Sequence, residues 1–400
     1  MIKGFNKMKY FIGIDVSKDT FHYCVVDCQS AEVAHGNLTM GITGFNALKQ
    51  VLNKHTDNAV AMESTGGYHT NLLSFILSFK REVCLVNPLL IKRFTQTMTL
   101  RKTKTDKADA KVIAQFACQN IEHLSYFQLT DYDEIAALAR AREDLSKQIA
   151  KAKTQLKQQV NIAFPELLSE FNIFTDTVLQ VLLKLPTTEV IRNTNIKNIA
   201  KIIGSVCGRG RRSNLSADKL KALAENSIGK SSAQMQQLIE HYVQMLLFLM
   251  EKMDKLTNTF IDAINQSNKD DMEIVSSIKG ISDITASHFL AEIKTIERFE
   301  SKSSLIAYAG TDPSVQQSGT RLHRGGRISK KGSSSLRRYL YLMATGVMIN
   351  NGYFRAYYLK KREQGMQHRK AMIALCNKLL RVIFALLKNR EKFVMPSHYL

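Results

Sequence analysis

The strongest constraint on the fold is a pair of β-forming runs near the N-terminus. Residues 10–16 (YFIGIDV) and 21–26 (FHYCVV) are dominated by β-branched and aromatic side chains, with Ser17-Lys18-Asp19-Thr20 between them. Two such runs joined by a four-residue turn predict a β-hairpin. The pattern of the following residues predicts a strand over 33–40, a helix over 44–55, strands over 59–63 and 82–86, and helices over 70–80 and from Pro88.

Three strands in a meander, followed by alternating helices and strands, predict an α/β domain with the element order of an RNase-H-like fold. The same opening strand and turn also occur in actin-like or sugar-kinase ATPases. That alternative requires a second Asp-x-Gly-Gly-type loop near the middle of the chain, and the sequence contains none.

Four acidic residues of this region form a candidate metal site. Asp15 interrupts an apolar strand, where an unpaired buried carboxylate is unfavourable. Glu63 ends another apolar strand, at the sheet edge where open α/β sheets place their sites. Asp106 and Asp109 lie one helical turn apart in an otherwise basic segment and share a helix face. Each acid alone can be a solvated strand end or helix start. Together they suit two Mg²⁺ (or Mn²⁺) ions flanking a phosphodiester.

The charge of the chain predicts a polyanionic partner. The sequence has 56 Lys+Arg against 35 Asp+Glu, a net charge of +21. Nucleic acid is the first candidate and an anionic membrane surface the second. No apolar run approaches the roughly 20 residues of a spanning helix, and the N-terminus lacks the apolar segment of a signal peptide. The six cysteines form no CxxC pair, so we expect reduced thiols in a cytoplasmic protein without a membrane partner.

The middle of the chain predicts a helical stalk. Residues 131–161 and 232–268 carry apolar residues at near-heptad spacing and are expected to form two long helices of a coiled coil. They can pair within the chain or between subunits. An insert, residues 165–230, is expected to contain helices over 177–185 and 188–206. Its Gly/Arg-rich run, residues 207–214, is either a phosphate-contacting loop or a solvated one.

The C-terminal part combines a helical turn with a long acid-free segment. Residues 275–286 predict either a helix-hairpin-helix unit, with Lys279 and Gly280 contacting one phosphate, or an ordinary helical corner. From Pro313 to Arg362 the chain has no Asp or Glu, which favours contact with nucleic acid. The expected nucleic-acid-binding residues are Lys279, Gly280, Arg321, Arg324, Arg327, Lys330, Lys331, Arg337 and Arg338.

One serine in the acid-free segment is a candidate nucleophile. Ser318 is expected on a flexible loop with small neighbours and with arginines and lysines that could hold phosphate oxygens. By residue chemistry alone, a hydrogen-bonding turn serine remains the commoner explanation. A final amphipathic helix, residues 371–388, is expected to cover the domain.

These motifs in their order resemble the DEDD transposases of certain bacterial insertion sequences, relatives of the Piv-type DNA invertases. The resemblance rests on Gly13-Ile14-Asp15-Val16, Glu63-Ser64-Thr65-Gly66, Val86-Asn87-Pro88, Lys104 to Ala110, and the blocks Ala307 to Thr311, Ser318-Gly319 and Ser329 to Gly332. It implies a RuvC-like nuclease domain whose metal ligands and catalytic acids are Asp15, Glu63, Asp106 and Asp109.

The resemblance further implies that Ser318 is the catalytic nucleophile, supported by Ser314, Ser329 and Ser333. The activity it implies is excision and insertion of a DNA element through a covalent phosphoserine. The implied partners are the DNA of the element ends and target, a structured bridge RNA encoded by the element, and further copies of the chain as a dimer or tetramer. A bacterial, nucleoid-associated location follows from these partners.

The expected domains are therefore a nuclease domain (1–125), a helical stalk (126–270) with its insert, and a C-terminal transposase domain (271–400). Two other functions remain open at this stage. One is a metal nuclease of the junction-resolvase type, which uses water and forms no covalent intermediate. The other is a non-catalytic DNA- or RNA-binding protein, for which the four acids would be dispensable.

Overall fold

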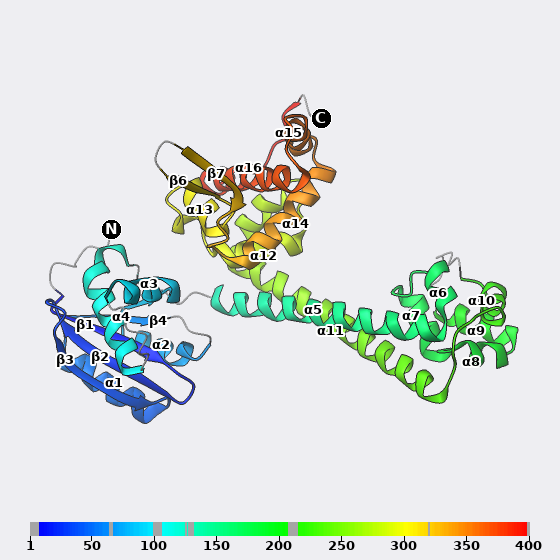
Figure 1. Cartoon of the computed structure of the whole chain (residues 1–400), viewed down its shortest axis with the longest axis horizontal. Coiled ribbons are helices and arrows are strands. Elements are labelled where there is room, and N and C mark those ends of the chain that lie inside the picture. The colour runs from blue at the N-terminus through cyan, green and yellow to red at the C-terminus, as the bar shows by residue number, and fades with distance from the viewer. Residues whose placement is uncertain are drawn as a thin grey trace. The chain divides into compact units, whose positions relative to one another are not determined.

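The computed structural model of the chain describes residues 8–63, 67–98, 106–124, 126, 132–206, 215–318 and 321–397. The chain divides into two compact units, residues 1–130 and 131–400. Figure 1 draws the first unit in blue to cyan and the second in green to red. The further division of the second unit into a stalk domain and a transposase domain stays a prediction.

The first unit has the expected order of elements. They are β1 (Tyr10–Val16), β2 (Thr20–Asp27), β3 (Glu32–Thr39), α1 (Ile42–Lys54), β4 (Asn58–Glu63), α2 (His69–Ser78), β5 (Val83–Val86), α3 (Pro88–Met98), α4 (Asp106–Asn120) and the 3₁₀ turn η2 (Ile121–His123). The mixed α/β character predicted from the alternation of apolar runs is confirmed.

The five strands form one sheet in the order β3-β2-β1-β4-β5. β1, β2 and β3 are antiparallel neighbours, whereas β4 pairs parallel with β1 and β5 pairs parallel with β4. β1 lies in the centre because it is apolar on both faces: residues 11–14 are all buried. A strand buried on both faces must be covered by helices on both sides.

The two faces of the sheet have separate apolar cores. Ile12 and Ile14 of β1 pack with Leu48 of α1 and Leu72 of α2 on one face. Phe11 of β1 packs on the other face, where helices α3 and α4 supply the covering side chains. The strand alternation therefore sends odd-numbered residues of β1 toward α4, and this parity decides where the candidate acids point.

The second unit is built mainly of helices. They are α5 (Tyr132–Ala163), α6 (Pro165–Glu170), α7 (Asp176–Lys184), α8 (Thr188–Asn193), α9 (Ile196–Val206), α10 (Ala217–Glu225), α11 (Ala233–Ser276), α12 (Asp283–Ile293), η3 (Ile296–Arg298), α13 (Lys302–Ala309), α14 (Ser334–Asn350), α15 (Gly352–Glu363) and α16 (His368–Asn389). Strands β6 (Pro313–Ser318) and β7 (Arg321–Ile328) pair with each other. No described helix is long and apolar enough to cross a membrane.

The two long helices expected for the stalk are present. α5 and α11 pack against each other over much of their length, as Figure 1 shows. α11 continues eight residues past the expected end, but Asn268 has non-helical angles (φ −158°, ψ 73°). The side-chain amide of Asn268 donates to Asp271 Oδ2 (2.6 Å), and its Oδ1 accepts from the Asp271 backbone N–H (3.1 Å). The predicted boundary therefore coincides with a kink that an asparagine stabilises.

Helices α6 to α10 form the insert, and they share one hydrophobic core with α5 and α11. The prediction of a single helix over 188–206 is wrong, because this segment forms two helices, α8 and α9, with a break between them. Asn195 Oδ1 accepts from the Lys197 backbone N–H (2.9 Å), so this residue starts a new helix. The Gly/Arg-rich run of residues 207–214 lies outside the described residues.

Candidate active site

Asp15 and Glu63 lie side by side at the carboxyl edge of the sheet. Ile14 of β1 is level with Met62 of the parallel strand β4, so the next residues along the two strands are Asp15 and Glu63. Residues level with each other on neighbouring parallel strands point to the same face, about 4.8 Å apart. Both carboxylates are half-buried. Two acids far apart in the chain therefore meet at the carboxyl ends of the neighbouring strands β1 and β4, on the face covered by α4.

Helix α4 crosses β1 at Gly13 without any intervening side chain. A Cβ atom on Gly13 would lie 2.3 Å from both the carbonyl oxygen of Ala110 and the backbone nitrogen of Ala114. At the other end of α4, the Cys118 thiol donates to the carbonyl of Asp27 (3.6 Å), which pairs with Tyr10 at the start of β1. The helix therefore runs antiparallel to β1, and its N-terminal turn is directed toward the carboxyl end of the strand.

This direction carries Asp109 toward the same edge as Asp15. Asp109 immediately precedes Ala110, the residue in contact with Gly13, and it is half-buried. Asp106 is the first residue of α4, but its side chain lies outside the described residues. Among the described side chains, no group of three or more His, Cys, Asp or Glu is close enough to hold a metal ion. The four-acid ligand set stays a prediction.

His22 is a neighbour of this edge that the sequence interpretation missed. It is paired directly with Asp15 across the β1–β2 hairpin and is half-buried. Directly opposite residues of antiparallel strands share a face. The signal was present in the sequence, because the four-residue turn already fixes which residues of the two strands face each other.

Ser318 ends β6 rather than lying on a loop. It pairs with Arg321, the first residue of β7, in a two-stranded antiparallel ribbon that Figure 1 shows at the edge of the second unit. The expected serine loop is corrected to this ribbon, whose ladder satisfies backbone groups that a loop would leave to water. The side chains of residues 314–318, including Ser314 and Ser318, lie outside the described residues.

The base of the ribbon is fixed by an aspartate just before β6. Ser329 donates from Oγ to Asp312 Oδ1 (2.5 Å), and the Ser329 backbone N–H donates to the Asp312 carbonyl (2.9 Å). The Lys330 backbone N–H donates to the carbonyl of Gly310 (3.1 Å), and both residues have positive φ. The two ends of the ribbon are therefore tied together where it joins the helices.

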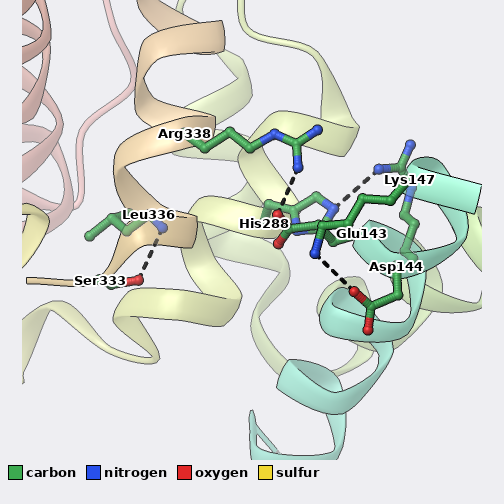
Figure 2. A network of polar contacts seen from close by, with 8 residues as sticks. Glu143, Asp144, Lys147, His288, Ser333, Leu336 and Arg338 are labelled. Atoms are coloured by element: carbon green, nitrogen blue, oxygen red, sulfur yellow. Dashed lines mark hydrogen bonds and ion pairs between the residues drawn. The ribbon is translucent and has the colours of Figure 1, made fainter. Parts of the chain in front are cut away.

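A second serine ties the segment after the ribbon to α12. Ser333 donates from Oγ to Glu292 Oε2 (2.7 Å) and accepts from the Leu336 backbone N–H (3.1 Å), which caps α14. Figure 2 shows the capping bond. The sequence did not single out Asp312, which directly precedes the acid-free segment, or Glu292, which lies 21 residues before it in α12.

Two family models match the chain on either side of the insert. Residues 12–165 match the transposase model for DEDD enzymes of IS110, and residues 272–359 match the transposase model for the IS116/IS110/IS902 family. The chain therefore belongs to the IS110 family of DEDD transposases. Its relationship to this family, expected from the motifs, is confirmed, and so is its class as a DNA transposase or recombinase.

Similar proteins span nearly the whole chain. The pilin gene-inverting protein of Moraxella lacunata is 24% identical over 397 residues, covering 98% of this chain and 99% of the relative. The mini-circle putative transposase for IS117 of Streptomyces coelicolor is 23% identical, covering 97% and 96%. The transposase for insertion sequence element IS1111A of Coxiella burnetii is 22% identical, covering 96% and 90%. The insert is therefore included in full-length matches.

The predicted nucleic-acid-binding residues of this transposase fall into three groups. Arg327, Lys330 and Lys331 are exposed at and beyond the end of β7, and Lys279 is exposed before α12. The side chains of Arg321 and Arg324 lie outside the described residues. Arg337 donates to the carbonyl of Ala309 (3.1 Å), and Arg338 forms an ion pair with Glu143 (2.7 Å). The last two therefore already have partners within the protein.

Gly280 has a packing role in the transposase that its sequence context did not reveal. Its φ is +104°, and a Cβ atom there would lie 2.5 Å from the carbonyl oxygen of Gly346 in α14. Conversely, a Cβ atom on Gly346 would lie 2.1 Å from the carbonyl oxygen of Gly280. The helical turn and α14 thus approach each other through two glycines. This close packing accounts for a glycine at position 280 without invoking a phosphate contact.

A buried polar cluster joins α5 to α11, α12 and α14. Arg142 donates from Nη1 to His288 Nε2 (3.2 Å) and from Nε to Thr257 Oγ1 (2.9 Å). His288 is stacked on Tyr339 of α14, with ring centroids 3.6 Å apart. Beside it, Arg338 pairs with Glu143, as Figure 2 shows.

The cluster keeps His288 neutral. Burial, and then the charges of Arg142 and Arg338, lower the pKa of His288 from 6.5 to about 3. Because an arginine can only donate, Nε2 must accept and the proton must lie on Nδ1. Within the described residues, buried Nδ1 has no hydrogen-bond partner. The histidine therefore acts here as a neutral acceptor that orients the arginine of the stalk.

Proposed function

We propose that this transposase excises and inserts an insertion sequence by cleaving and rejoining DNA through a covalent phosphoserine formed by Ser318. One observation carries the proposal. Asp15 and Glu63 are level with each other at the carboxyl edge of the central strands, and α4 directs its acidic N-terminal turn toward that edge. Together with the β3-β2-β1-β4-β5 strand order, this supports an RNase-H-like, RuvC-like nuclease domain.

Asp15, Glu63, Asp106 and Asp109 would hold two divalent ions, Mg²⁺ or Mn²⁺. The donor set fits, because all four residues offer carboxylate oxygens and these ions prefer oxygen ligands. Two donors come from rigid central strands, so their separation is set by the sheet and not by a loop. When bound, the ions would polarise the scissile phosphate.

Ser318 would attack the phosphorus atom of the scissile phosphodiester. A bond forms between Oγ and phosphorus, the bond from phosphorus to one deoxyribose oxygen breaks, and the serine proton is passed to the leaving oxygen or to water. The phosphoserine keeps the number of phosphate ester bonds constant. A deoxyribose hydroxyl can therefore displace the serine later and rejoin DNA without ATP.

The partners in this proposal are the DNA of the element ends and of the target, a structured bridge RNA that guides the choice of site, and further copies of the chain. The net charge of +21 supports nucleic-acid binding but does not distinguish DNA from RNA. The ribbon cations, Lys279 and the backbone at Gly280 would contact phosphates. The helix-hairpin-helix and coiled-coil assignments belong to the same proposal, with α5 and α11 offering the surface for a dimer or tetramer.

The decisive experiment is to trap a protein–DNA adduct on a DNA carrying the element ends together with its flanking RNA-coding segment. The wild-type chain is expected to give an adduct that denaturant does not dissociate, and Ser318→Ala is expected to give none. Ser334→Ala is the matched control, because this serine lies exposed at the start of α14 in the same segment. An adduct formed by Ser318→Ala would refute the proposal.

A second set of variants tests the acids. Asp15→Asn, Glu63→Gln, Asp106→Asn and Asp109→Asn should each abolish cleavage, whereas Asp19→Asn, in the exposed turn directly after β1, should not. Cleavage without any adduct would favour a nuclease of the junction-resolvase type. Full strand exchange after neutralisation of Asp106 and Asp109 would leave only a non-catalytic binding role for this region.

A further inference from the structure

The turn between α15 and α16 gathers five cations. Lys360, Lys361 and Arg362 lie in the last turn of α15, and Arg369 and Lys370 lie in the first turn of α16. The only acid between them is Glu363. We call these five residues the basic turn. It lies just beyond the residues that match the second family model, which end at 359.

The cations of the basic turn have no carboxylate partners within the described parts of the chain. Lys361 donates to the side-chain oxygen of Gln364 (3.0 Å) and Arg362 to the carbonyl of Met366 (2.7 Å), but these neutral acceptors leave both positive charges uncompensated. Elsewhere on the second unit, exposed lysines do pair: Lys219 with Glu170 (2.7 Å), Lys392 with Glu273 (2.8 Å). Charges of one sign held this close together repel each other unless a polyanion neutralises them. The basic turn therefore differs from the parts of the second unit where lysines are paired with acids.

The helix dipoles of α15 and α16 add to the excess of positive charge at the basic turn. Cations in the last turn of α15 are stabilised by the negative end of its helix dipole, but they lie beside the positive end of α16. The first turn of α16 has no acid and instead begins with His368, Arg369 and Lys370. Cations are unfavourable at a helix N-terminus unless an anion lies there. The cations in the first turn of α16 therefore interact unfavourably with the dipole of their own helix unless an anion is bound there.

The basic turn is ordered by the protein alone. Backbone N–H groups of Gln364, Gly365 and Met366 donate to carbonyls of the last turn of α15, at 3.0 to 3.1 Å. Tyr358 Oη and His368 Nδ1 form a hydrogen bond of 2.8 Å that ties α15 to α16. A preformed arrangement of cations loses little entropy when a rigid polyanion binds.

The tyrosines beside the basic turn indicate which form of nucleic acid it fits. Proteins that bind single strands stack bases on available aromatic rings. Here Lys361 Nζ lies over the Tyr357 ring, 5.7 Å from its centroid, and Tyr358 is hydrogen-bonded to His368. Both tyrosines are half-buried. The basic turn therefore offers charge without a free stacking surface, which suits the phosphate backbone of a duplex.

We propose that the basic turn binds the backbone of double-stranded DNA without reading bases. This inference rests on the proposed function in one respect only, namely that the substrate is DNA. It assigns the flanking duplex a docking surface separate from the ribbon that carries Ser318.

The test compares two triple variants with the same loss of charge. Lys360→Gln/Lys361→Gln/Arg362→Gln removes three cations of the basic turn, and Lys157→Gln/Lys197→Gln/Lys201→Gln removes three exposed lysines of α5 and α9. Binding of a duplex DNA is measured as the dissociation constant against salt concentration. The first variant is expected to lose about tenfold in affinity and to lower the slope of log K against log salt by roughly 2 to 3. The control should lower it by less than about 1.

An unchanged slope in the first variant, or an equal change in both, overturns the proposal. Two further probes are a duplex RNA and a single-stranded DNA of the same length. A loss confined to either of them also overturns it, because the surface would then serve another partner. Far-ultraviolet circular dichroism checks that α15 and α16 remain folded. Ser318→Ala and Asp15→Asn should retain the full slope, so failure of the covalent mechanism and failure of this inference give different results.

Discussion

Gly13 and Ala110 are in backbone contact: a Cβ atom on Gly13 would lie 2.3 Å from the Ala110 carbonyl oxygen. This contact lets α4 lie directly on β1. Because it fixes the height of the helix over the strand, it also fixes the position of Asp109, the neighbour of Ala110, relative to Asp15. The site therefore depends on a residue that carries no chemistry.

Gly13→Ala is expected to destabilise the first unit by about 1–3 kcal/mol, because both atoms facing the new methyl group are backbone atoms and α4 must move away. Cleavage should fall further than stability, since the carboxylates separate. Chemical denaturation and a cleavage assay measure the two effects. Gly41→Ala, where nothing lies within 4 Å of the added methyl group, should change both only slightly. Similar results for the two variants would contradict the close approach.

His288 predicts an acid-sensitive second unit. With a folded-state pKa of about 3 against 6.5 unfolded, His288 is neutral in both states at pH 7 and lowers stability as the pH falls. Below pH 6.5 only the unfolded chain takes up the proton, so stability is lost at up to about 1.4 kcal/mol per pH unit until the pH nears 3.

The check is a pH series of unfolding free energies for wild type and His288→Gln. The variant should be less stable at pH 7 but should lose less stability between pH 6 and pH 4. His241→Gln, which changes an exposed histidine of α11, is the control. Parallel pH curves for wild type and His288→Gln would disprove the assignment.

Arg390 is expected to stabilise the second unit strongly. It pairs with Asp271, whose side chain is only 1% exposed and whose pKa is raised chiefly by burial. Removing the cation in Arg390→Gln leaves a buried carboxylate unpaired, at a cost of about 3 kcal/mol. Lys392→Gln breaks the exposed pair with Glu273 and should cost less than about 1 kcal/mol. Thermal and denaturant unfolding of the two variants distinguish these values, and equal costs would rule out a special role for Asp271.

Asp312 is expected to position the ribbon that carries Ser318. In Asp312→Ala the Ser329 hydroxyl loses its acceptor, and the rate of adduct formation should fall roughly 100-fold, as for a small misplacement of a reacting group. Ser329→Ala should have the same effect, and the double variant should be no worse than either single one. DNA affinity should be unchanged throughout. Additive losses in the double variant would show that the two residues act separately.

A shared active site predicts complementation between inactive chains. If Ser318 of one subunit works with the acids of another, mixtures of Asp15→Ala and Ser318→Ala chains should recover part of the activity that each lacks alone. Strand exchange is measured after mixing the two chains, with each chain alone as the reference. Absence of any recovery in a mixed oligomer, verified by differently tagged chains, would favour a site built within one chain.

Local pattern was sufficient for much of the fold. The runs of β-branched, aromatic and other apolar residues over 10–26, 59–63 and 82–86 predict strands, and near-heptad spacing predicts α5 and α11, because residue type and spacing depend on which sides of an element are buried. Two helix boundaries are set by asparagine side chains that hydrogen-bond to residues close by in the sequence. Asn268 kinks α11 near the expected end, and Asn195 breaks the helix expected over 188–206.

The sequence by itself determined which residues are candidates for the chemistry: Asp15, Glu63, Asp106 and Asp109 are acids in apolar strands or in a basic segment, and Ser318 is singled out by the resemblance to the family. Only the tertiary structure decided that Asp15 and Glu63 are level on neighbouring strands and that Gly280 approaches Gly346. It also replaced the expected serine loop with a ribbon tied by Asp312. The physical reason is that strand register and helix crossings are set by contacts between distant segments, which no local pattern records.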